Sequence, residues 1–207
     1  MKTIINFKEY ISEETGLGSL TIFDIDDTLF HTTAQIAVVK DGKTLKKLTN
    51  SEFNTYKLAD GESFDFSEFK DAAKFYKESK PISKMITKAM IILKNAQKNP
   101  NSKVIILTAR SNFDDKEKFL ATFRKHGFDI DKVRVERAGE LVKNEVPAVA
   151  KAIVVTRYLN SGKYNKVRLF DDSMSNLKEF LRLQSKFKDV KFEAYFAKPD
   201  GSIKTIK

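Results

Sequence analysis

The chain contains no cysteine and no tryptophan, and only 4 of its 207 residues are proline. Without cysteine there is no disulfide, no thiolate metal site and no cysteine nucleophile. The two histidines do not form the ligand pattern of a zinc site. Any chemistry must therefore come from carboxylates, hydroxyls, amides and cationic side chains.

Long hydrophobic segments are also missing. No apolar run reaches the roughly 18 residues that a membrane-spanning helix needs. The first residues, MKTIINFKEYISEETGLG, are not typical of a signal peptide, because Asn6, Lys8 and Glu9 interrupt the apolar positions. These absences predict a cytoplasmic protein without a membrane partner.

Positive charge is in excess, with 38 Lys and Arg against 28 Asp and Glu, a net charge of +10. Such a field attracts phosphorylated small molecules and nucleic acids. The lysines are spread along the chain, however, so a charged surface that serves solubility explains the excess equally well. Composition does not determine the oligomeric state.

Short apolar segments alternate with amphipathic ones through most of the chain. Alternating strands and helices predict an α/β fold, here a three-layer Rossmann-like parallel sheet with helices on both faces. The predicted strands cover residues 20–25, 103–109, 133–137, 167–170 and 190–197. The predicted helices cover residues 4–11, 82–98, 114–126, 148–160 and 174–184.

Residues 31–80 interrupt this alternation. Asp41-Gly42 between two short runs predicts a β-hairpin. Residues 65–79 predict a helix with Phe66, Phe69, Ala73 and Tyr76 on one side, and Pro81 is expected to begin the next helix. We therefore assign 1–30 and 81–207 to the α/β core, and 31–80 to a β-hairpin flap with a small helical cap insertion.

Polar residues follow three of the predicted strands: Asp24-Ile-Asp26-Asp27-Thr28, Thr108-Ala-Arg110 and Asp171-Asp172. In a parallel sheet the carboxyl ends of the strands meet at one edge, where ligands bind. One acid after a strand is usually a turn or cap residue. Several clustered carboxylates repel one another unless a hard cation such as Mg²⁺ lies between them.

These residues resemble the motifs of the haloacid dehalogenase superfamily over roughly residues 20–197. Its first motif, DxDxT, matches Asp24 to Thr28 after an apolar strand. Its second, a Thr or Ser at a strand end, matches Thr108 in VIILTAR. Its acidic pair matches Asp171-Asp172 in RLFDDSMSN. For the remaining motif, a lysine upstream of that pair, we choose Lys151, with Lys143 as the alternative.

The resemblance implies a Mg²⁺-dependent phosphatase. Asp24 would attack phosphorus and form an aspartyl-phosphate, and Asp26 would act first as general acid and then as base. Mg²⁺ would be bound by the Asp24 carboxylate, the Asp26 backbone carbonyl and Asp171, with Asp172 supporting that shell.

The resemblance also implies donors around the transferred phosphoryl group. Thr108 and Lys151 would contact it, and Thr28 would hold the loop near Asp24. Arg110 would either contact the phosphate or lie on the surface. Asn176 would either position the acidic loop or face solvent.

The spacing from Pro81 to Asp172 is similar to that in the phosphatase half of polynucleotide kinase 3′-phosphatases, and residues 111–130 are the closest part. This similarity favours nucleotides or nucleic-acid 3′ ends as substrates. No GxxxxGK[ST] kinase loop is present. One alternative is a phosphoacceptor receiver domain, but there the acidic pair precedes the phosphorylated Asp. The other is a nucleic-acid-binding or regulatory protein on this fold without turnover.

Overall fold

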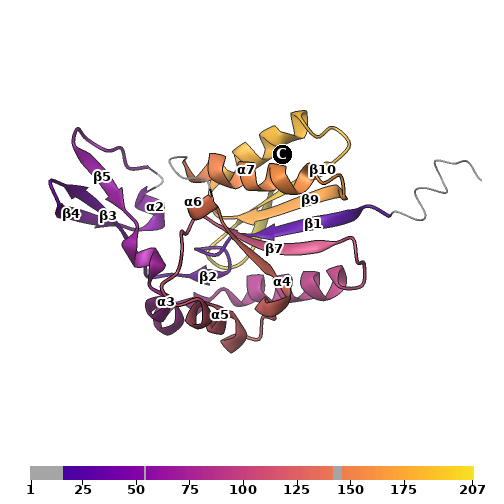
Figure 1. The fold of residues 1–207 in the computed structure, drawn as a ribbon, viewed down its shortest axis with the longest axis horizontal. Coiled ribbons are helices and arrows are strands. Elements are labelled where there is room, and N and C mark those ends of the chain that lie inside the picture. The colour runs from indigo at the N-terminus through magenta and orange to yellow at the C-terminus, as the bar shows by residue number, and fades with distance from the viewer. Residues whose placement is uncertain (1–15, 54, 142–145) are drawn as a thin grey trace, which may run out of the picture.

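A computed structural model describes residues 16–53, 55–141 and 146–207. Its centre is a six-stranded sheet in the order β11-β10-β9-β1-β7-β8 (Figure 1). All neighbours pair in parallel except β11, which runs antiparallel to β10. The strands are β1 (Gly18–Phe23), β7 (Lys103–Thr108), β8 (Arg134–Arg137), β9 (Tyr164–Asp171), β10 (Lys191–Ala197) and β11 (Ile203–Ile206).

The mostly parallel α/β architecture expected from the sequence is confirmed, and all five predicted strands that belong to it are present. The edge strand β11 was not predicted. Its IKTI segment is short and half exposed, so it lacks the apolar run that marks the inner strands. The helix predicted at 4–11 lies outside the described residues.

The central strands are apolar on both sides because helices cover both faces of the sheet. On β1, Leu20 and Ile22 pack into one core and Phe23 into the other. On β7, Ile105 and Ile106 point into opposite cores in the same way. This alternation explains why these strands read as continuous hydrophobic runs.

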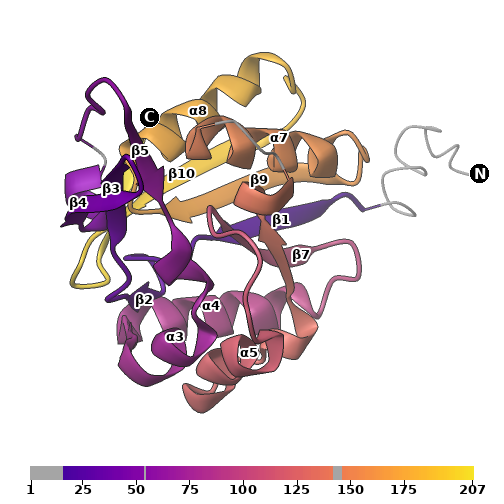
Figure 2. The same ribbon diagram turned by 60° about the vertical axis from the view of Figure 1, so that its left-hand side comes forward.

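One face of the sheet is covered by α3 (Ala72–Glu78), α4 (Ser83–Ala96) and α5 (Lys116–Lys125) (Figure 2). The other is covered by α6 (Ala138–Leu141), α7 (Pro147–Leu159) and α8 (Met174–Arg182). Short 3₁₀ turns, η2 (Ile130–Lys132) and η3 (Leu183–Ser185), complete these layers. In the described part of the chain no helix is long and apolar enough to span a bilayer.

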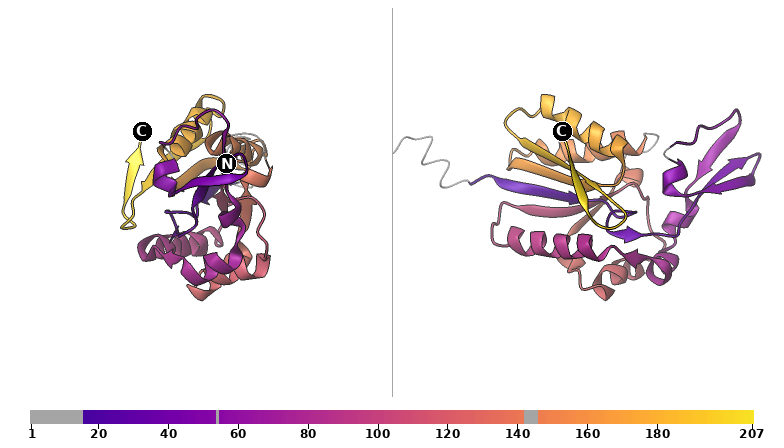
Figure 3. Two further views of the ribbon diagram at one scale, coloured as in Figure 1. Left: turned by 90° about the vertical axis from the view of Figure 1, so that its left-hand side faces the viewer. Right: turned by 180° about the vertical axis from the view of Figure 1, so that it is seen from behind.

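The 31–80 insertion stands beyond the carboxyl ends of the strands (Figure 3). Its base is closed by β2 (Phe30–His31), which pairs antiparallel with β6 (Lys80–Pro81). Above this base, β3 (Ile36–Lys40), β4 (Lys43–Leu48) and β5 (Glu62–Asp65) form a sheet in the order β4-β3-β5. The hairpin predicted at Asp41-Gly42 joins β3 to β4, and both residues have positive φ, as a tight hairpin turn requires.

The single helix predicted over 65–79 is wrong. The segment divides into the end of β5, a 3₁₀ turn η1 (Ser67–Lys70) and α3. Asp71 interrupts the helical pattern, because its carboxylate accepts a hydrogen bond from the Lys74 amide at 2.7 Å and caps a new helix. Ala73 is consequently exposed.

Pro81 does not begin a helix either. It pairs with Phe30 in the short ladder between β6 and β2, and α4 begins at Ser83. The insertion begins and ends at this ladder, so its two ends are brought together next to the loop that follows β1.

The order of the strands determines where a ligand can bind. From β1 the chain passes to β7 and β8 on one side, and it later returns to β9 and β10 on the other. The segment after β1 leads toward α4 on one face, and the segment after β9 leads into α8 on the opposite face. Such a reversal leaves a crevice beyond the carboxyl ends of β1 and β9.

Candidate active site

Two aspartates occupy this crevice because β1 and β9 pair in register. Phe23 of β1 lies opposite Phe170 of β9. The residues that follow, Asp24 and Asp171, therefore lie side by side at the carboxyl ends of the two strands. They are only 5% and 0% exposed. Two carboxylates removed from water in this way need a compensating positive charge.

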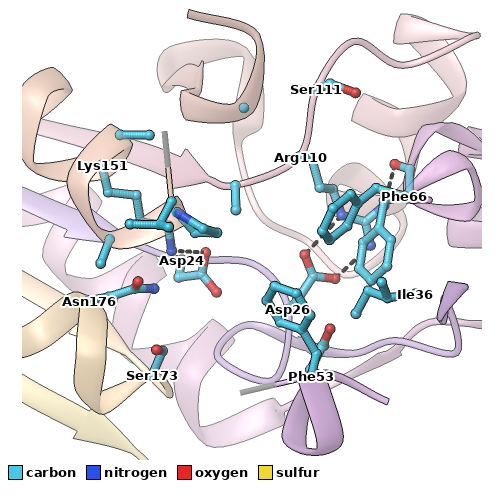
Figure 4. A pocket seen from close by; sticks show the side chains of 18 of the residues that line it. Asp24, Asp26, Ile36, Phe53, Phe66, Arg110, Ser111, Lys151, Ser173 and Asn176 are labelled. Atoms are coloured by element: carbon cyan, nitrogen blue, oxygen red, sulfur yellow. Dashed lines mark hydrogen bonds and ion pairs between the residues drawn. The ribbon is translucent and has the colours of Figure 1, made fainter. Parts of the chain in front are cut away.

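Lys151 supplies part of that charge from α7. Its side chain is buried, and its Nζ lies 2.7 Å from Asp24 Oδ1 and 2.8 Å from Asp171 Oδ2. Figure 4 shows the ammonium reaching the Asp24 carboxylate from the helix side. The structure thus brings together one residue from β1, one from β9 and one from α7. The alternative lysine, Lys143, lies outside the described residues.

Further hydrogen bonds hold the Asp171 carboxylate. The Asn176 amide Nδ2 donates to both of its oxygens, at 2.9 and 3.0 Å, and the Ser173 backbone N–H donates at 2.9 Å. Asn176 is buried on the first turn of α8, so its solvent-facing alternative is wrong. Thr28 is buried as well, and its hydroxyl lies 3.5 Å from an oxygen of Asp172.

The acidic cluster carries more negative charge than Lys151 can balance. Burial raises the pKa of Asp24 to about 7; Lys151 opposes this shift, and the charges of Asp171 and Asp26 add to it. Burial, with the charges of Asp171 and Asp24, raises the pKa of Asp172 to about 9. Burial disfavours the charged form of Lys151, but the same acids outweigh this and raise its pKa above the usual value. The protein alone therefore stabilises this group of acids incompletely.

The cluster suits a divalent cation. Asp24, Asp171 and Asp172 each offer a carboxylate oxygen, and these atoms lie within 4.8 Å of one another. Three carboxylates and one ammonium leave two negative charges uncompensated when all are ionised. Carboxylate oxygens are the ligands that Mg²⁺ prefers, and its two positive charges match this excess.

The Asp26 carboxylate is not part of that group. It forms two hydrogen bonds with the Arg110 guanidinium, from Nε at 2.9 Å and from Nη2 at 2.6 Å. The third contact of Arg110 runs from Nη1 to the Phe69 carbonyl at 3.0 Å, and its guanidinium lies over the rings of Phe69 and Phe75. Arg110 is buried, so the surface alternative for this residue is wrong.

Thr108 ends β7 beside this pair. It is fully buried, and its Oγ1 accepts a hydrogen bond from the Arg110 backbone N–H at 3.1 Å. It does not line the cavity described below. In this structure Thr108 therefore holds the start of the loop that carries Arg110.

A cavity of about 530 Å³ connects the two carboxylates of the first motif to the insertion. Asp24, Lys151 and Asp172 line one end, and Asp26 and Arg110 line the middle. The insertion contributes Ile36, Asn50, Phe53, Phe66, Phe69 and Lys70. Figure 4 shows Phe53, Phe66 and Ile36 around Asp26, on the far side from Lys151. The volume lies within the range of small-molecule sites.

Sequence reasoning missed how the loop after β1 is joined to the insertion. Asp27 has a positive φ of 56°, and its carboxylate accepts a hydrogen bond from Asn50 Nδ2 at 2.9 Å. Its other oxygen lies 3.4 Å from His31 Nδ1. Aspartate tolerates this left-handed conformation better than most residues, so its presence here was the one feature of the sequence that could have indicated a tight turn. Asp27 thus joins the loop after β1 to the part of the insertion that lines the cavity.

No protein-family model matches this chain, and no curated protein matches it significantly.

Proposed function

We propose that this protein is a Mg²⁺-dependent phosphatase that hydrolyses phosphate monoesters through an aspartyl-phosphate at Asp24. The buried ion pairs of Lys151 with Asp24 and Asp171, at the point where the strand order reverses, carry the proposal. The resemblance to the haloacid dehalogenase superfamily, including its Rossmann-like core, supports it. Burying an acidic cluster of this kind costs free energy, which favours a functional role for it.

The residues divide the reaction between them. An oxygen of Asp24 attacks phosphorus, and the bond from phosphorus to the leaving oxygen breaks. Asp26 must be protonated at this step, with one of its oxygens released from Arg110; it gives that proton to the leaving oxygen, and the alcohol departs. Asp26 then takes a proton from a water molecule, which attacks phosphorus and breaks its bond to Asp24. Inorganic phosphate is released, and both aspartates return to their starting states.

The cations have separate tasks in this scheme. Lys151 places positive charge beside Asp24, where the phosphoryl oxygens arrive. Arg110 holds the Asp26 carboxylate in place through two parallel hydrogen bonds. Mg²⁺, held by Asp24, Asp171 and Asp172 with the Asp26 backbone carbonyl, would shield the anionic nucleophile from the anionic phosphate.

The direct test is hydrolysis of para-nitrophenyl phosphate with and without Mg²⁺. We expect activity that requires Mg²⁺ and is abolished by Asp24→Asn, which keeps the shape of the side chain and removes the nucleophile. Asp189→Asn, which changes an exposed aspartate before β10, is the matched control and should retain full activity. Full activity in Asp24→Asn would overturn the assigned nucleophile.

The intermediate can be tested separately. Rapid acid quenching during turnover should trap one phosphoryl group per chain, and peptide mass spectrometry should place it on Asp24. Nucleic-acid binding without turnover is the second candidate, favoured by the net charge of +10. It predicts neither hydrolysis nor a trapped phosphoryl group, but salt-dependent binding of oligonucleotides.

A further inference from the structure

The cavity has two chemically different ends. The end at Asp24 and Lys151 is charged, whereas the end under the insertion has an apolar surface formed by Ile36, Phe53 and Phe66, with polar residues of the insertion around it: Asn50, Asp65, Ser67 and Lys70. The wall at the start of α7 is apolar too, with Val146, Pro147 and Ala148. The phosphate chemistry described above uses the charged end and Asp26 in the middle of the cavity, so the apolar end is available to the group that carries the phosphate.

We propose that the apolar end binds a nucleobase, so that the substrate is a nucleoside monophosphate whose base lies between Phe66 and Val146. This inference rests on the proposed phosphatase function, because Asp24 fixes where the phosphate sits. It goes further by naming the substrate class and the two side chains that select it.

The Phe66 ring has no aromatic partner stacked on its face in the part of the chain that the structure describes. It is 41% exposed although it lines a cavity. Its ring contacts with Phe53 and Phe69 are edge-to-face, with interplanar angles of 84° and 61°, and its contact with Phe64 is tilted. Among the described residues no aromatic ring stacks on it. A flat face without a stacked partner is what a planar ligand uses.

The backbone around Phe66 fixes this orientation. The Asp65 carboxylate accepts hydrogen bonds from the Ser67 N–H at 2.8 Å and from the Ser67 hydroxyl at 3.0 Å. This tight turn lies between β5 and η1, and the buried Phe69 anchors η1 from below. Phe66 therefore projects from a fixed turn, and little side-chain order would be lost on binding.

The cavity wall formed by Val146 and Pro147 lies at the start of α7, the helix that carries Lys151. Val146 is 62% exposed, and the following proline restricts it to an extended backbone, with φ of −66° and ψ of 147°. Pro147 lies one helical turn before Lys151, so both lie on the same face of α7. A ligand whose phosphate contacts Lys151 thus has the apolar start of α7 along its side.

The size of the cavity favours a nucleotide over a simple aryl phosphate. A cavity of about 150 Å³ accommodates a benzene ring. The 530 Å³ found here leaves room for a sugar and a phosphate beside a base. Lys70 and Asp65 both lie exposed on the insertion side of the cavity, and because their charges are opposite, the attraction for the phosphate comes from Lys151.

The experiment compares adenosine monophosphate with ribose 5-phosphate, which has the same phosphate and sugar but no base. We expect the wild type to have a kcat/KM for the nucleotide at least about tenfold higher, given what one stacked base contributes. Phe66→Ala and Val146→Ser should remove most of this preference, lowering kcat/KM for the nucleotide by a much larger factor than kcat/KM for ribose 5-phosphate. Leu58→Ala, which changes an exposed side chain of the insertion outside the cavity, is the control and should keep the preference.

Binding to the Asp24→Asn variant, measured by calorimetry with Mg²⁺, separates this inference from the proposed function. Tighter binding of the nucleotide than of ribose 5-phosphate supports the base site even if the wild type shows no turnover, in which case only the phosphatase proposal fails. Equal binding of the two compounds overturns the base site. Tighter binding of phosphotyrosine than of the nucleotide also overturns it, in favour of a directly phosphorylated ring.

Because Phe66 also packs on its neighbours, Phe66→Ala can disturb the insertion. Val146→Ser changes a mostly exposed residue on the other wall and does not carry that risk. If both variants lower the turnover of both substrates by the same factor, the two side chains do not select a base and the inference is wrong.

Discussion

The two acids of the DxD motif lie only two residues apart, yet they belong to differently built regions. Asp24 is held by the α/β core, through Lys151 of α7 and the neighbouring strand end at Asp171. Asp26 is held by Arg110, which is itself bound to the Phe69 carbonyl of the insertion. The core therefore positions the proposed nucleophile, and the insertion positions the proposed acid. Substitutions in the two regions should therefore affect nucleophilic attack and leaving-group protonation separately.

The largest effect is expected on the core side. Lys151→Met removes the ammonium from between two buried carboxylates and should lower kcat by about a thousandfold. It should also lower the free energy of unfolding by about 3 kcal/mol, because the carboxylates are left uncompensated. Activity assays and denaturant unfolding measure both effects. Lys178→Met, at an exposed position of α8, should change neither; a fully active Lys151→Met would contradict the role of this lysine.

The insertion side is tested through the leaving group. Arg110→Gln and Arg110→Lys lose the paired hydrogen bonds to Asp26, and should lower kcat for alkyl phosphates by about a hundredfold. Hydrolysis of para-nitrophenyl phosphate should fall much less, because its leaving group needs little protonation. Asp26→Asn should give the same pattern, whereas Arg182→Gln, an exposed arginine of α8, should have no effect. Equal losses for both substrates would show that Arg110 does not act through Asp26.

A smaller effect is expected from the shell around Asp171. Asn176→Ala removes both amide hydrogen bonds to this carboxylate and should raise the Mg²⁺ concentration for half-maximal activity by about tenfold. Excess Mg²⁺ should restore most of the activity. Asn165→Ala, on an exposed position of β9, is the control. An unchanged Mg²⁺ requirement would mean that Asn176 has only a packing role.

The smallest effect concerns how the stability of the insertion depends on pH. Burial disfavours the charged form of Glu68, but hydrogen bonds from Lys47, Lys74 and the Gln35 amide outweigh it and lower its pKa from 4.5 to about 2. A lowered pKa stabilises the folded state above pH 4.5, and this stabilisation is lost as the pH falls from 4.5 toward 2. The protection factors for amide hydrogen exchange in the insertion, corrected for the intrinsic pH dependence of exchange, should therefore fall over that range before those in β1 do.

Glu68→Gln is the matched variant for this measurement. At pH 7 it should exchange faster than the wild type within the insertion, and below pH 3 the two should converge. A constant difference at all pH values would show that the charge of Glu68 is not what stabilises the insertion.

The elements of the core could be predicted because their signals are local. An apolar, β-branched run such as KVIILT forms a buried strand, and Gly127, with a φ of 77°, follows the end of α5 in the left-handed conformation in which helices commonly end. In the insertion the local signals conflict. The aromatic residues Phe64, Phe66 and Phe69 fit one face of a helix and a strand followed by a turn equally well. In the folded protein, packing favours the strand and turn.

The partners of the polar side chains were harder to predict. Arg110 was a phosphate ligand or a surface residue on sequence grounds, yet its guanidinium is buried between two phenylalanines and an aspartate. Nothing near it in the chain signals this, because Asp26 and Phe69 lie 84 and 41 residues away. The same holds for Asn176, whose partner Asp171 is close in sequence but whose burial depends on α7 packing against α8.

By itself, the amino-acid sequence determined five of the six strands of the central sheet and that acidic residues follow two of them, since both follow from short-range patterns of apolar and polar residues. Only the tertiary structure decided that β1 and β9 are neighbours, that Lys151 lies between their acids, and that Phe66 and Val146 line the same cavity. The physical reason is that these juxtapositions depend on packing between segments far apart in the chain, and no local pattern encodes that packing.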